Sequence, residues 1–287
     1  MQNHQKKERT VWIDAVRVVA CLMVIVLHVS AQMVVKYKEM DRLDWQIVNV
    51  FDSLVRPCVP LFFMVSGYIF LNDKNIKIKN ITRMVYCILF YSAIAVVYML
   101  ITNRYNPLER LSKILEFPVF YHLWFFYSLF GCYLLFYFLK YGGISGLKSM
   151  LFIVFIFVFL NPVTYQIISI TGVYIKSRFF IDGSFVYLFL YSVAGAALGK
   201  MDTRRLGVIS PFLVFVISSI FTSWLIYCHA GMLNKFNGTF YSNSSPVVFI
   251  SSVSVFIAIK NFYTERKLNR LAAMVASLSL PIYGVHK

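Results

Sequence analysis

Charged residues are scarce in this sequence of 287 residues. Asp, Glu, Lys and Arg together make up 14% of the chain, whereas a soluble globular domain carries about 25%. This deficit excludes an ordinary soluble protein. The 28 Lys and Arg residues outnumber the 12 Asp and Glu residues and give a net charge of +16. Because the basic residues lie in short gaps between apolar runs, their excess indicates membrane topology, and we expect no nucleic-acid partner.

Several sequence motifs of soluble enzymes are also absent. The sequence contains no glycine-rich phosphate loop, no HExxH, no GxSxG and no Cys/His cluster. Nucleotide hydrolysis and zinc chemistry therefore have no support, and we expect no metal. The cysteines lie inside apolar runs and form no CxxC pair, so we interpret them as small buried apolar residues. They are Cys21, Cys58, Cys87, Cys132 and Cys228.

Apolar residues are abundant instead, at 59% of the chain. They form runs long enough to cross a bilayer as helices. We therefore predict an all-α fold, a polytopic integral membrane helical bundle of about nine spans with the last incomplete. We expect one domain over residues 1–287, truncated at its C-terminus. The predicted spans are 11–35, 45–71, 84–102, 121–139, 150–170, 185–199, 208–228, 246–262 and 271–286.

Proline and glycine predict how some of these spans are built. Pro57 and Pro60 should interrupt the second span near its middle, and Pro162 should break the fifth, because proline removes a backbone donor and clashes with the preceding turn. Gly195 and Gly199 have GxxxG spacing, which is typical of close helix packing.

The distribution of basic residues predicts the orientation. Sixteen lysines and arginines lie in the N-terminal segment and in the gaps after even-numbered spans, against nine in the gaps after odd-numbered spans. The side richer in Lys and Arg is normally cytoplasmic. We therefore predict a multi-pass protein with a cytoplasmic N-terminus. We expect its membrane to be the bacterial inner membrane.

The first predicted span contains polar residues whose presence inside a membrane needs an explanation. Asp14, Arg17 and His28 interrupt the apolar run 11–35, and a charge at the centre of a bilayer costs on the order of 2.5 to 3.5 kcal/mol. Eleven positions separate Arg17 from His28, so they return to nearly the same helix face, roughly 16 Å apart along the axis. One face of this helix is thus polar at two depths.

Each of these residues has two interpretations. His28 is placed to act as a general base on an acceptor hydroxyl, or it is satisfied by a neighbouring helix. Arg17 is placed to bind a phosphate or carboxylate, or it pairs with Asp14 or extends to the headgroups. Arg56 lies near the middle of the second span, either as a functional charge or in a salt bridge with Asp52.

Four stretches of the sequence resemble the membrane-bound acyltransferase 3 family, and within it the branch that includes the O-acetyltransferase of enterobacterial common antigen. Those stretches are Ile13-Asp14 with Arg17 and His28, the segment 59–68 (VPLFFMVSGY), the segment 121–125 (YHLWF) and the segment 279–286 (SLPIYGVH). The resemblance covers nearly the whole chain, and the spacing of Arg17 and His28 is its most specific part.

This resemblance implies transfer of an acyl group, usually acetyl from acetyl-CoA, onto a hydroxyl of a surface polysaccharide or lipid-linked glycan. His28 would then be the catalytic base, and Arg17 and Arg56 would bind the donor or stabilise developing negative charge. The remaining candidates would bind substrate, although Ser66 also suits close packing and His122 and Trp124 an interfacial aromatic belt. These substrate-binding candidates are Ser66, His122, Trp124 and His286.

A second hypothesis from a different class stays open. The same polar residues inside the membrane would suit a transporter or exporter of a glycan or lipid-linked intermediate that performs no acyl transfer. The expected partners are acyl-CoA, a glycan acceptor and membrane lipids in the first case, and only the glycan and lipids in the second.

Overall fold

The computed structural model describes residues 11–73, 78–102, 118–120, 123–138, 151, 153–155, 157–158, 161–172, 183–264, 266 and 268–285. All regular structure within this part of the chain is helical. Five of its helical segments are long and apolar enough to cross a membrane, and they are 11–34, 42–72, 78–102, 209–233 and 239–263. The prediction of an all-α membrane helical bundle is therefore confirmed, while the total of nine spans stays a prediction.

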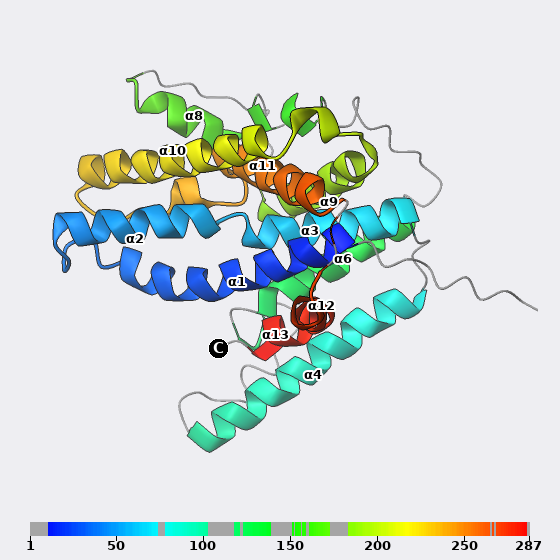
Figure 1. Cartoon of the computed structure of the whole chain (residues 1–287). Coiled ribbons are helices and arrows are strands. Elements are labelled where there is room, and N and C mark those ends of the chain that lie inside the picture. Colours follow the sequence, from blue (N-terminus) through cyan, green and yellow to red (C-terminus); the bar gives the residue numbers. More distant parts are fainter. Residues whose placement is uncertain are drawn as a thin grey trace, which may run out of the picture. The chain divides into compact units, whose positions relative to one another are not determined.

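The chain divides into two compact units, and the single domain predicted above stays a prediction. The first unit comprises residues 1–62, 202–241 and 247–279. In this unit α2 packs against α1 on one side and against α10 on the other, and α12 also contacts α1 (Figure 1). Its helices are α1 (Val11–Val34), α2 (Arg42–Val55), α10 (Ile209–Leu233), most of α11 (Pro246–Tyr263) and α12 (Arg270–Ser277), with short 3-10 turns η4 (Arg204–Leu206) and η5 (Thr239–Tyr241).

The second unit comprises residues 63–201, 242–246 and 280–287. In it α4 packs against α6, α6 against α9, and α9 against the π-helical turn η1. The described helices are the second half of α3 (Cys58–Gly67), η1 (Tyr68–Asp73), α4 (Ile78–Thr102), α6 (Trp124–Phe138), α8 (Pro162–Ser169), α9 (Ser184–Lys200) and most of α13 (Ser279–Val285).

The second predicted span is interrupted near Pro57 and Pro60, where the sequence predicts a break. α2 ends at Val55 and α3 begins at Cys58. Pro57 and Pro60 have no backbone N–H, so the helix loses the hydrogen bonds that they would donate to the preceding turn. Pro162 likewise begins a new helix, α8, which is capped by the side chain of Asn161 accepting from the N–H of Val163 at 2.9 Å.

Glycine contacts in the second unit confirm the predicted close packing. A Cβ atom added to Gly67 would clash with the backbone of Ser192 on α9, and one added to Gly195 would clash with the backbone of Met64 on α3. The α3 and α9 backbones therefore touch directly. Small residues permit this approach, which supplies van der Waals packing where lipid provides no hydrophobic drive between helices.

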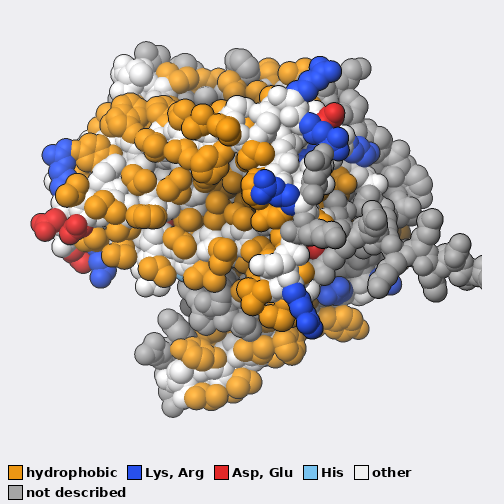
Figure 2. Space-filling model, in the orientation of Figure 1, with side chains coloured by type: hydrophobic (Ala, Val, Ile, Leu, Met, Phe, Trp, Pro, Cys, Tyr) orange, Lys and Arg blue, Asp and Glu red, His pale blue; other side chains and the backbone are white. Residues whose placement is uncertain are grey.

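The surface of the first unit is apolar over its long helices. Figure 2 shows hydrophobic side chains crowded over α10, α2 and α1. Exposed examples are Ile25 on α1, Phe51 on α2, and Ile217 and Trp224 on α10. In a soluble protein such a surface would bind a partner or aggregate, but on helices of this length it matches the hydrocarbon of a bilayer.

Several element boundaries differ from the predictions, and α2, for example, begins at Arg42 rather than at residue 45. α4 begins at Ile78 rather than at residue 84, and α10 continues to Leu233 rather than to residue 228. The ninth span is not one helix, because α12 ends at Ser277 and α13 starts at Ser279. Pro281 explains this break, since it cannot donate to the carbonyl of Ser277, four residues earlier.

Candidate active site

The first helix is continuous through all of its polar residues. α1 runs unbroken from Val11 to Val34, so Arg17 and His28 lie on nearly the same face, roughly 16 Å apart along the axis. Both side chains are half-buried, and Cys21 and Val24, which share that face, are buried between them. The structure therefore places Arg17 and His28 on one face of a continuous helix, and their depths in the membrane stay a prediction.

Arg17 is paired within its own helix. Its Nη1 lies 3.4 Å from Oδ1 of Asp14, one turn earlier. The Asp14 side chain is only 6% exposed, whereas that of Arg17 is 31% exposed. Asp14 thus anchors the buried side of the guanidinium. The predicted intrahelical pair is therefore present.

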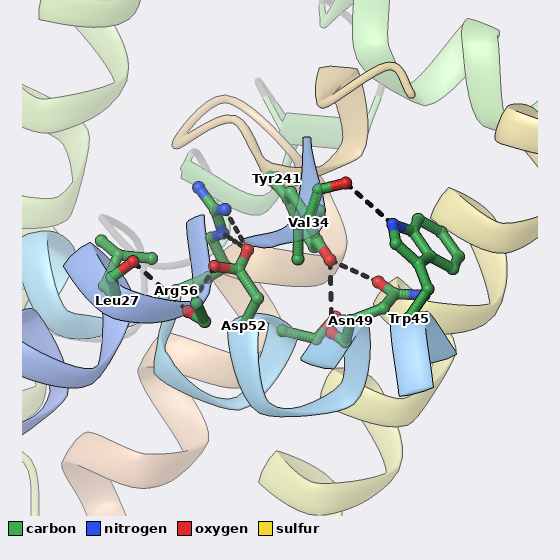
Figure 3. A network of polar contacts seen from close by, with 9 residues as sticks. Leu27, Val34, Trp45, Asn49, Asp52, Arg56 and Tyr241 are labelled. Carbon is green, nitrogen blue, oxygen red and sulfur yellow. Dashed lines mark hydrogen bonds and ion pairs between the residues drawn. The ribbon is translucent and has the colours of Figure 1, made fainter. Parts of the chain in front are cut away.

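Arg56 also has an acidic partner. Its Nε donates to Oδ2 of Asp52 at 2.8 Å, and its Nη2 contacts the same oxygen (Figure 3). The other carboxylate oxygen of Asp52 accepts a hydrogen bond of 2.6 Å from the hydroxyl of Ser30 on α1. Asp52 is fully buried. The predicted salt bridge is therefore present. The same carboxylate also links α2 to α1 through its hydrogen bond from Ser30.

A residue from a distant part of the chain completes this cluster. The guanidinium carbon of Arg56 lies 3.9 Å from the centre of the Tyr241 ring, which is a cation–π contact. The Tyr241 hydroxyl donates to the side-chain oxygen of Asn49. The Asn49 amide in turn donates to the backbone carbonyl of Ser223 on α10 at 2.9 Å. Arg56 is thus held between a carboxylate and an aromatic face.

The spacing of polar residues on α2 produces this arrangement. Trp45, Asn49, Asp52 and Arg56 recur every three or four residues and therefore share one helix face. Trp45, at the start of this series, donates its indole N–H to the carbonyl of Val34 on α1 at 2.8 Å. The series thus turns its polar groups toward neighbouring helices instead of toward lipid.

His28 lies apart from this network. It precedes Ser30 by two residues, and at about 100° per residue the two side chains leave α1 about 160° apart. Since Ser30 faces Asp52, His28 is directed to another side of the helix. The structure therefore unites Arg17 with His28 along one face, and Arg56 with Asp52 and Tyr241 elsewhere in the same unit.

The predicted substrate-binding residues belong to the second unit as far as they are described. Ser66 is half-buried on α3 beside the close-packed Gly67, and Trp124 is half-buried at the start of α6. His122 and His286 lie outside the described residues. Their roles in binding stay predictions.

An aromatic cluster in this second unit brings three of the sequence motifs together. Phe125 packs against Phe63 with ring centres 5.3 Å apart and against Tyr283 at 4.4 Å. Phe126 lies 5.9 Å from the same tyrosine. The segments around residues 63, 125 and 283 are thus parts of one packed core, although more than 200 residues separate the first from the last.

Sequence reasoning missed Ser30, Asn49 and Tyr241 as members of the Arg56 cluster. The spacing on α2 was a usable signal for Asn49, since it lies one turn from Asp52 and two from Arg56. Tyr241 offered no such signal, because it lies in a polar stretch that the apolar pattern assigns to a loop. It is nevertheless only 4% exposed.

Metal chemistry gains no support in the described part of the chain, where no three His, Cys, Asp or Glu residues gather closely enough to hold an ion. Within the described helices of the first unit, Asp14 pairs with Arg17 and Asp52 pairs with Arg56. Such pairs inside membrane helices commonly mark substrate sites or pathways.

Comparison with known proteins identifies the family of the chain. A family model described as an acyltransferase domain matches residues 10–287. No curated protein and no solved structure matches the chain significantly. The family match includes the Arg17–His28 helix, the Arg56 cluster and the aromatic core of the second unit. The chain therefore belongs to the acyltransferase 3 family and is a membrane-embedded acyltransferase.

Proposed function

We propose that this protein transfers an acetyl group from acetyl-CoA to a hydroxyl of a cell-surface polysaccharide or of a lipid-linked glycan. The observation that carries the proposal is the common face of Arg17 and His28 on the unbroken helix α1. A cation that binds phosphate and an imidazole that accepts a proton are the two groups that a CoA-dependent acyl transfer needs. The sequence resemblance to the O-acetyltransferase of enterobacterial common antigen favours a glycan acceptor.

The reaction begins at His28. Its imidazole takes the proton of the acceptor hydroxyl while that oxygen attacks the thioester carbonyl of acetyl-CoA. The resulting tetrahedral intermediate collapses, its carbon–sulfur bond breaks, and the CoA thiolate leaves with the proton from the imidazolium. The products are the acetyl ester and free CoA. A cation near the thioester oxygen would stabilise the negative charge of the intermediate.

Arg17 binds the donor in this proposal. Asp14 contacts one nitrogen of its guanidinium, and the Arg17 side chain is 31% exposed. The planar guanidinium has the donor geometry that suits the phosphates of CoA. Arg17 and His28 are separated by roughly 16 Å along the helix, comparable with an extended pantetheine arm. Phosphate binding at Arg17 therefore allows the thioester to reach His28.

The proposed setting is the bacterial inner membrane, with the N-terminus in the cytoplasm. Arg17 then lies toward the side where acetyl-CoA is made, and His28 lies toward the outer side, where a glycan acceptor arrives. The bias of Lys and Arg between alternate loops supports this orientation. Ser66, His122, Trp124 and His286 are the proposed substrate-binding residues beyond the first unit.

The decisive experiment replaces His28 by Ala in the full chain. Loss of a general base lowers the rate by about a hundredfold or more, so membranes with this variant should transfer almost no label from [14C]acetyl-CoA to glycan. His229 on α10 is also half-buried, and His229→Ala is the matched control. It should retain transfer, and both variants should reach wild-type levels in the membrane.

The outcomes separate the proposal from its alternative. Full transfer by the His28→Ala variant would remove His28 as the base. Wild-type membranes that export or flip the glycan but never label it would contradict acetyl transfer and support the transporter hypothesis. Glycan mass with and without the gene gives an independent check, since each transferred acetyl group adds a fixed mass.

A further inference from the structure

We propose that Asp52 and Tyr241 position Arg56 so that its guanidinium binds an uncharged oxygen, that of a sugar hydroxyl on the glycan acceptor. This inference rests on the proposed function and assigns the acceptor a binding residue outside the Arg17–His28 face. Arg56 is then the contact to substrate, and Asp52 and Tyr241 act through it.

Arg56 is constrained on two sides. Its Nε and Nη2 contact Asp52, and its plane lies over the Tyr241 ring at 3.9 Å. Both partners are themselves fixed, because Ser30 donates to Asp52 and the Tyr241 hydroxyl donates to Asn49. Ser30, Asn49, Asp52 and Tyr241 are all at most 5% exposed. The orientation of the guanidinium is therefore set before any ligand arrives.

One edge of Arg56 is left for a ligand. A guanidinium has five N–H donors, and Asp52 accepts from only the Nε–Nη2 edge. The described residues provide no acceptor for Nη1. The Arg56 side chain as a whole is 20% exposed, so the network does not enclose it completely. Because an unsatisfied donor away from bulk water costs free energy, Nη1 needs an oxygen from water or from a bound molecule.

The adjacent helix break supplies acceptors to complement these donors. Pro57 cannot donate to the carbonyl of Ser53, and Pro60 cannot donate to the carbonyl of Arg56, because proline has no N–H. Both carbonyls therefore lack their usual helical donors, at the same point of the chain as the Nη1 edge. The break between α2 and α3 thus offers hydrogen-bond donors and acceptors together.

These groups favour a hydroxyl over an anion. A hydroxyl both donates and accepts, so it satisfies Nη1 and a carbonyl, whereas a phosphate only accepts at these positions. Asp52 contacts both Nε and Nη2 of Arg56, and it neutralises this charge more fully than Asp14, whose contact with Nη1 of Arg17 is 3.4 Å long, neutralises that of Arg17. An anion added at Arg56 would therefore face the carboxylate and remain uncompensated. Polysaccharides present neutral hydroxyls at high density, and they are the acceptor class that suits this site.

The test uses the full chain in proteoliposomes, with the uncharged surface glycan purified from cells that lack the gene. KM values are measured separately for this glycan and for acetyl-CoA, and direct binding of the glycan is measured by calorimetry without acetyl-CoA. Losing a hydrogen bond from a charged donor weakens binding by about tenfold or more. Arg56→Lys and Tyr241→Leu should therefore raise the glycan KM about tenfold and leave the acetyl-CoA KM unchanged.

Two further variants keep the test independent of folding. Tyr241→Phe retains the ring over Arg56 but loses the bond to Asn49, and it should raise the glycan KM by about threefold. Phe240→Leu removes the neighbouring buried aromatic of the same turn, and it should change neither KM by more than about twofold. A merely structural role for Tyr241 would instead lower thermal stability and kcat without separating the two KM values.

The inference is overturned if the glycan KM and glycan binding stay unchanged in Arg56→Lys and Tyr241→Phe. It is also overturned if the acetyl-CoA KM rises instead, or if inorganic phosphate displaces the neutral glycan. Failure of the proposed function would look different. The wild-type protein would bind the glycan, lose that binding in Arg56→Lys, and transfer no acetyl group.

Discussion

The two units of this protein use different physical means to hold helices together in a membrane. In the first unit, polar side chains bridge α1, α2 and α10 through Ser30, Asp52, Arg56, Asn49 and Tyr241. In the second, α3 and α9 touch through glycines, and aromatic rings fill the adjoining core. Both are established solutions, since lipid gives helices no hydrophobic reason to associate.

The difference indicates where the chemistry resides. Glycine packing brings backbones together without placing an ionisable group in the membrane, and it needs no function to explain it. Burying a charge in a membrane costs free energy, so the charged pairs of the first unit indicate a role in binding or transferring substrate. We infer that the first unit carries the acyl-transfer groups and the Arg56 contact to the acceptor. The second unit then supplies a tightly packed scaffold for the other proposed substrate-binding residues.

The largest stability effect is expected in the scaffold. Gly195→Ala places a Cβ against the backbone of Met64, and a backbone yields less easily than a side chain. We expect a loss of about 3 kcal/mol, at the upper end of the range for overpacking. Denaturant titration in detergent micelles measures it. Gly231 on α10 has open space around it, so Gly231→Ala is the control and should stabilise by about 0.5 kcal/mol. Equal stability in the two variants would contradict direct backbone contact.

A smaller loss is expected from breaking the buried pair. Asp52→Asn removes the counter-charge of Arg56, and we expect it to cost about 2 kcal/mol, because Arg56 is partly exposed and keeps some hydration. The double variant Asp52→Leu/Arg56→Met replaces the pair with apolar side chains, and it should recover most of this stability. Acetyl transfer should nevertheless be lost in the double variant.

That combination sharpens the comparison between the units. A stable but inactive double variant would show that the Asp52–Arg56 pair serves function rather than stability, as we infer for the first unit. If the double variant instead unfolded as readily as Asp52→Asn, the polar network would be needed for stability, as the glycine contacts of the second unit are. The same titration, with the acetyl-transfer assay, distinguishes these results.

The smallest effect concerns a single hydrogen bond in the first unit. Trp45→Phe keeps an aromatic ring between α1 and α2 but removes the indole N–H that donates to Val34 at 2.8 Å. We expect a loss of about 1 kcal/mol in the denaturant titration, since a typical net hydrogen bond contributes that amount. A loss as large as that of Gly195→Ala would mean that polar bridges are as essential as glycine contacts.

Much of the fold was predictable because its signals are local. Long apolar runs require helices, since a backbone in lipid must satisfy its own hydrogen bonds. Prolines mark breaks through their missing N–H, as at Pro57 and Pro162. The GxxxG spacing of Gly195 and Gly199 predicted close packing, which the contacts with Met64 and Tyr68 confirm. The boundaries of α4 and α10 were less accurate. Polar residues begin α4 before its apolar run, and His229 interrupts the apolar pattern of α10 without ending the helix.

The candidate site was predictable only in part. The Arg17–His28 spacing follows from helical periodicity alone, so the sequence determined that these residues share a face. Whether Arg56 is paired, and with what, depends on rotamers and neighbours, and both alternatives were open from the sequence. The contact of Arg56 with Tyr241 spans 185 positions of the chain.

By itself, the sequence determined an all-helical membrane protein with a polar first helix, a proline-broken second span and glycines that bring helices together. These properties depend on hydropathy and on periodicity within single segments. Only the tertiary structure decided that a tyrosine from an apparent loop covers Arg56 and that Ser30 and Asn49 fix the partners of that arginine. Such contacts join segments far apart in the chain, and no local pattern records which distant residue will fill a given space.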